Sequence, residues 1–60
     1  MKSDLVDVTV TLKRETDKAV LVDHGGDECW LPKSLIEIEQ DGKAHIVTLP
    51  EWLAQEKGMI

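Results

Sequence analysis

The side chains best suited to metal or nucleophilic chemistry are His24, Cys29 and His45. A structural zinc site usually takes four ligands, often as two closely spaced pairs. Here four residues separate His24 from Cys29, and no second pair follows. The acidic loop DHGGDE, residues 23–28, also lacks the alternating acids and distant glutamate of a calcium loop. The spacing therefore favours three unconnected side chains, and we expect no metal site.

Nucleophilic catalysis would need Cys29 as a thiolate beside His24 or His45. Cys29 instead precedes Trp30 in an apolar run, a setting typical of a small buried residue. No nucleophile, base and orienting group form a recognisable set. The glycines of the HGG segment lead into acids and a strand, whereas a phosphate site needs a glycine turn that opens a helix. We expect a protein that is not an enzyme and uses no cofactor.

Four residues are candidates for binding a partner: Trp30, Lys33, Lys13 and Arg14. Small β-barrels bind single-stranded nucleic acid through stacked aromatic side chains and a basic groove. The chain, however, holds 12 acidic against 7 basic residues, a net charge of −5 that repels phosphate backbones. A small core also needs its large side chains, which favours Trp30 packing inside. Nucleic-acid binding is therefore an alternative and not the favoured function.

The length of 60 residues predicts one domain, residues 1–60. A domain this small buries only about 60% of the surface of its unfolded chain. A single cysteine cannot form an intramolecular disulfide, so self-association is the expected source of extra stability. The first ten residues do not resemble a signal peptide, and no apolar run approaches the roughly 18 residues of a membrane span. We expect a soluble cytoplasmic protein.

Hydrophobic periodicity predicts a mainly β fold. Residues 5–15 alternate, with valines and Leu12 on one face and polar residues on the other. Ile36 and Ile38 alternate in the same way with Glu37 and Glu39. Strands are also expected over AVLVD, ECWL and AHIVTL, separated by turns at TDK and DHGGDE and by a type I′ turn at Asp41-Gly42.

The last residues change to a helical pattern. Thr48 and Glu51 fit a capping box, and Gly58 suits the left-handed residue that ends a helix. Leu49, Trp52 and Leu53 would anchor this helix to the sheet. The fold expected is a small antiparallel β-barrel or curled sheet, SH3-like or OB-like, with one short C-terminal helix.

Three segments, ETDKAVLV, WLPKSLIEIE and LPEWLAQEKGMI, together resemble a group of small proteins of tailed bacteriophages and prophages. Members of that group carry a W-[LI]-P-K-S segment and a closing P-E-W-L-A-x-x-K-G helix. The resemblance covers residues 15–60. It implies a phage or prophage setting but no mechanism, because the group has no established activity.

We therefore expect a non-enzymatic protein-interaction module that binds itself, as a homo-oligomer, or another protein. The segment WLPKS is expected to be mainly scaffold, with Trp30 in or near the core and Lys33 exposed. The edge of the strand over residues 5–12 is one candidate for association. Two alternatives remain: an accessory protein for single-stranded nucleic acid, and an acidic inhibitor of a host defence nuclease that presents carboxylates in place of phosphates. Glu37 and Glu39, on one strand face, are the acids that suit the second alternative.

Overall fold

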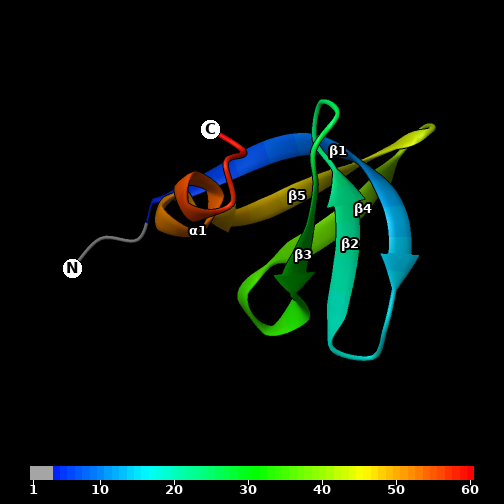
Figure 1. Ribbon diagram of the computed structural model, residues 1–60, viewed down its shortest axis with the longest axis horizontal. Coiled ribbons are helices and arrows are strands. Elements are labelled where there is room, and N and C mark those ends of the chain that lie inside the picture. The colour runs from blue at the N-terminus through cyan, green and yellow to red at the C-terminus, as the bar shows by residue number, and fades with distance from the viewer. Residues whose placement is uncertain (1–3) are drawn as a thin grey trace.

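The structure, a computed structural model, describes residues 4–60, so the first three residues of the predicted domain lie outside it. The alternating segments form the strands β1 (Leu5–Glu15), β2 (Ala19–Asp23), β3 (Glu28–Pro32), β4 (Glu37–Asp41) and β5 (Ala44–Pro50), followed by the helix α1 (Glu51–Glu56). A short 3₁₀ helix (Lys33–Leu35) joins β3 to β4. The predicted mainly β fold with one short C-terminal helix is confirmed (Figure 1).

All pairings are antiparallel, and the strand order is β3-β2-β1-β5-β4. The sheet is therefore open: β3 and β4 are its edges, and no hydrogen-bonded pairing between described residues closes it into a barrel. β1 is the central strand. Its two sides are paired along different halves, so residues 5–10 have a strand partner on the β5 side alone, and the use of this segment as an association edge stays a prediction.

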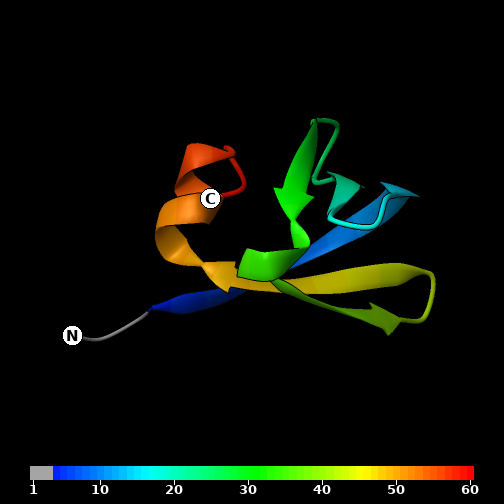
Figure 2. The same cartoon turned by 90° about the horizontal axis from the view of Figure 1, so that it is seen from below.

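The two halves of β1 have different neighbours. Leu5–Val10 pairs with β5, whereas Thr11–Glu15 pairs with β2 across a register shift at Lys13. The β2–β3 hairpin and α1 consequently lie on the same side of the β4–β5 ribbon (Figure 2). A bulge is a common device for bending a strand in this way.

The hydrophobic core fills the space between the β4–β5 ribbon and the β2–β3 hairpin and α1 that lie on one side of it. Its buried side chains come from β1, β2, β3, β5 and α1: Val10, Val20, Val22, Leu31, Val47, Leu49, Leu53 and Ala54. Ile36 and Ile38 pack against this cluster, while Glu37 and Glu39 are exposed, as their alternation predicted. Among the described residues no polar or charged side chain belongs to the buried class. No helix among them is long and apolar enough to cross a membrane.

The β4–β5 turn differs from its prediction. Asp41 pairs with Ala44, so the two central residues are Gly42 and Lys43. Only Gly42 has a positive φ, of 65°. A type I′ turn needs positive φ at both central residues and is excluded, whereas glycine at the first central position suits type II′.

The caps of α1 also differ in part. Pro50 is the N-cap, and no side chain of residues 4–60 caps the first turn. The Thr48 hydroxyl instead donates to Asp7 Oδ1 at 2.6 Å, so the predicted capping box is wrong. At the other end Gly58 has φ 74°, and the Met59 N–H donates to the Ala54 carbonyl at 2.8 Å. These are features of a Schellman motif, which confirms the predicted role of Gly58.

Candidate functional site

Trp30 lies on the outer face of β3, with 44% of its surface exposed. The expectation that it packs in or near the core is wrong. Neighbouring residues of a strand point to opposite faces, and Leu31 is fully buried, while Cys29 packs against the core. Trp30 must therefore face outward, whatever its size.

The cross-strand register builds a surface around this indole. Trp30 pairs with Leu21, which pairs in turn with Arg14, so the three side chains form one row across β3, β2 and β1. In the adjacent row Ala19 pairs with Pro32, and both are half-buried. We call these five residues the Trp30 surface. Four of the five side chains of this surface are apolar, and the guanidinium of Arg14 lies at its β1 side.

Charged residues lie on both faces of the sheet around β3. Lys33 Nζ lies 2.6 Å from Glu15 Oε2, and this hydrogen bond and the lysine charge lower the pKa of Glu15. Lys33 is therefore half-buried and engaged, not freely exposed as expected. Two rows along from Ala19, Asp23 pairs with Glu28 on the same face. Of the predicted binding residues, Arg14 is thus the one that shares a row with Trp30, while Lys13 is exposed at the bulge.

His24, Cys29 and His45 do not form a site. No group of three or more potential metal ligands occurs among residues 4–60. His24 lies in the β2–β3 loop, whereas His45 is on β5, paired with Val10 and Gln40. Cys29 is half-buried rather than fully buried as expected, and it packs against the core, where burial raises the pKa of its thiol.

Carboxylates gather on the outer face of β1, β5 and β4. Asp7 and Glu37 both pair with Thr48, and Glu39 and Asp41 continue the line along β4. Successive acids of this line are about 7 Å apart by strand geometry. We call these four residues the acidic face. The expectation that Glu37 and Glu39 share a face is confirmed.

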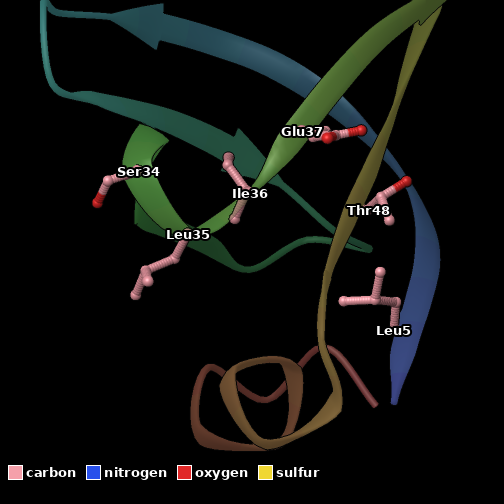
Figure 3. A pocket seen from close by; sticks show the side chains of 6 residues that line it. All are labelled: Leu5, Ser34, Leu35, Ile36, Glu37 and Thr48. Carbon is pink, nitrogen blue, oxygen red and sulfur yellow. The ribbon is translucent and has the colours of Figure 1, made fainter. Parts of the chain in front are cut away.

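A shallow groove of about 220 Å³ lies at the end of the acidic face (Figure 3). Leu35, just before β4, and Leu5, on β1, flank β5, and both are exposed, at 45% and 61%. This groove was not predicted from the sequence. A signal was present, because Leu5 and Leu35 are apolar residues at positions that share a face with Asp7 and Glu37.

No protein-family model, curated protein or solved structure matches this chain. The resemblance to small phage and prophage proteins therefore stays a prediction. The surfaces described above are the basis on which a function can be inferred.

Proposed function

We propose that this protein is a non-enzymatic protein-interaction module, of phage or prophage origin, that binds its partner through the Trp30 surface. The observation that carries the proposal is the half-exposed Trp30, aligned with Leu21 and Arg14. Tryptophan and arginine are the residues most often responsible for binding energy at protein interfaces. An exposed apolar patch with a polar rim marks such an interface.

The charges around Trp30 favour a protein partner over nucleic acid. Lys33 is bound to Glu15, and Asp23 and Glu28 lie on the same face as Trp30. A phosphate backbone crossing this face would approach two carboxylates for each free cation, on a chain with a net charge of −5. Mixed charges around an apolar centre suit the rim of a protein interface.

The test uses the Trp52→Phe variant, in which Trp30 is the only indole. Its emission in dilute solution should be that of a solvent-exposed tryptophan, and a single-stranded oligonucleotide at low salt should leave it unchanged. The matched Trp30→Phe variant reports Trp52 and controls for non-specific quenching. A blue-shifted emission in dilute solution would remove the surface on which the proposal rests. Quenching by the oligonucleotide that salt reverses would establish the nucleic-acid alternative instead.

A second candidate function, an acidic inhibitor of a host defence nuclease, is supported by the acidic face. Glu37, Glu39 and Asp41 present carboxylates in one line at intervals of about 7 Å, similar to the spacing of phosphates along a strand of nucleic acid. Cleavage assays with host restriction nucleases test it. Inhibition should disappear when all three acids are replaced by amides and persist in Trp30→Ala. No inhibition by the wild-type chain, or inhibition that survives in the amide variant, would reject it.

A further inference from the structure

We infer that the partner of this module is a second copy of the same chain, added antiparallel along the free edge of β3. The inference rests on the proposed function and deepens it, because it specifies the partner and the geometry. It follows from the backbone groups that the edge leaves free and from the charges along the two edge strands.

β3 is an edge strand, and its hydrogen bonds to β2 fix which of its residues face outward. The His24 N–H donates to the Asp27 carbonyl at 2.9 Å, and the Lys33 N–H donates to the Lys18 carbonyl at 2.8 Å. Bonded and non-bonded pairs alternate in an antiparallel ladder. Cys29 and Leu31 therefore use their backbone groups for β2, while those of Glu28, Trp30 and Pro32 point away from the sheet.

Antiparallel pairing of two copies, centred on Trp30, is compatible with the charges. Trp30 lies opposite Trp30 of the second copy, and Glu28 lies opposite Pro32. Beyond these, Asp27 approaches Lys33 of the second copy. β3 follows an acidic loop and is followed by a lysine, so a two-fold axis brings opposite charges together at both ends of the pair. The row Arg14–Leu21–Trp30 then continues across the two-fold axis into the same row of the second copy. The two tryptophans at its centre form a cross-strand aromatic pair, which stabilises an antiparallel sheet.

The other edge cannot accept its own copy in this way. An antiparallel pair of β4 strands centred on Glu39 would place Glu39 opposite Glu39 and Glu37 opposite Asp41. A shift of one residue places Glu37 opposite Glu39. Like charges directly opposite each other destabilise a sheet, and acids on an edge strand are a common protection against pairing. Of the two edge strands, β3 is therefore the one that can accept its own copy.

Pro32 limits the strength of this association. It is one of the three residues whose backbone faces outward, and proline has no N–H to donate. Each copy therefore lacks one donor of the paired edge. Restoring that donor should tighten the dimer, a result that a face-to-face contact through Trp30 does not predict.

Sedimentation of the full chain over a wide concentration range tests the inference. The wild type should form a dimer reversibly, Trp30→Ala should weaken the dimer about 30-fold, and Pro32→Ala should tighten it about tenfold through two added hydrogen bonds. Glu39→Gln should leave it unchanged. Circular dichroism verifies that each variant is folded.

A second comparison does not depend on how well Pro32→Ala folds. Asp27→Lys places a lysine opposite Lys33 of the second copy and should weaken the dimer about threefold or more. Glu56→Lys, an exposed change at the end of α1 with the same change in net charge, should not weaken it.

Three results would overturn the inference: a wild type that stays monomeric at high concentration, a dimer tightened by Glu39→Gln, or equal effects of Asp27→Lys and Glu56→Lys. Each leaves the proposed function standing. That function is decided by the emission of Trp30 in dilute solution and with oligonucleotide, a measurement that needs no dimer.

Discussion

Two neighbouring residues of α1 should differ sharply in their contribution to stability. Leu53 is 3% exposed and belongs to the core, whereas Trp52 is 56% exposed. Replacing a buried leucine by alanine costs about 2–5 kcal/mol in the free energy of unfolding. A chain of this length holds roughly 3–9 kcal/mol in total. Leu53→Ala should therefore remove at least about a fifth of the stability and lower the Tm by about 8–40 °C.

Trp52→Ala should cost less than about 1 kcal/mol, although it removes a larger side chain, because exposed substitutions change stability little. Urea unfolding followed by far-ultraviolet circular dichroism measures both variants without relying on indole emission. Trp52→Phe is the conservative control and should unfold at the wild-type midpoint. If Trp52→Ala destabilises the protein as much as Leu53→Ala, tryptophan anchors the helix and the outward placement of its side chain is refuted.

Three further results are expected. Lys33→Met should raise the pKa of Glu15 towards its ordinary value, as measured by NMR titration. The ion pair lowers the pKa of Glu15 in the folded state, so it stabilises the fold at pH values above the ordinary carboxyl pKa. This stabilisation is lost as the pH falls through the lowered pKa of Glu15. The Lys33→Met variant has no such stabilisation to lose and should therefore lose less stability in acid than the wild type. Burial raises the pKa of the Cys29 thiol, so this thiol should react with a thiol reagent more slowly in the folded protein than in the urea-unfolded chain. Equal rates would contradict its burial. The stability linked to the neutral thiol should be lost as the pH rises above the ordinary thiol pKa. Gly58→Ala should lower the free energy of unfolding by about 1–2 kcal/mol, because a φ of 74° is strained for an L-residue. An added Cβ at this position would meet no other atom within 4 Å, so steric crowding does not contribute. D-alanine at this position, introduced by chemical synthesis, should fold without that cost.

The sequence predicted features that depend on local pattern. Period-two alternation placed Ile36 and Ile38 inward and Glu37 and Glu39 outward, and the structure agrees. Gly58 was identified because only a residue without a side chain enters the left-handed region at little cost. These features need no knowledge of which strands become neighbours.

The two tryptophans show where the prediction failed. Trp30 was assigned to the core by its size, since a small core needs large side chains, and Trp52 by its helical spacing from Leu49 and Leu53. Strand alternation overrides size at Trp30, because Leu31 already faces inward. At Trp52 the helix surface that meets the sheet is occupied by Leu53 and Ala54.

Strand order was the other missing information. The sequence placed two acids of the acidic face on one strand, but only the β1–β5 and β4–β5 registers add Asp7 to them. The Trp30 surface likewise needs the pairing of Arg14 with Leu21. The Trp30 surface combines residues from three strands and the acidic face combines residues from two, so no single segment carries either pattern.

The pairing of the first strand with the last has a consequence for how the chain folds. β1 with β2 and β3, and β4 with β5, are local units, but Leu5 meets Pro50 only after nearly the whole chain has been synthesised. Such distant contacts form slowly. Until then the valine-rich segment Leu5–Val10 has no partner on the side of β5, and segments of this composition aggregate readily. Asp7 places a charge in its middle, which keeps the waiting strand soluble until the same carboxylate accepts the Thr48 hydroxyl in the finished sheet.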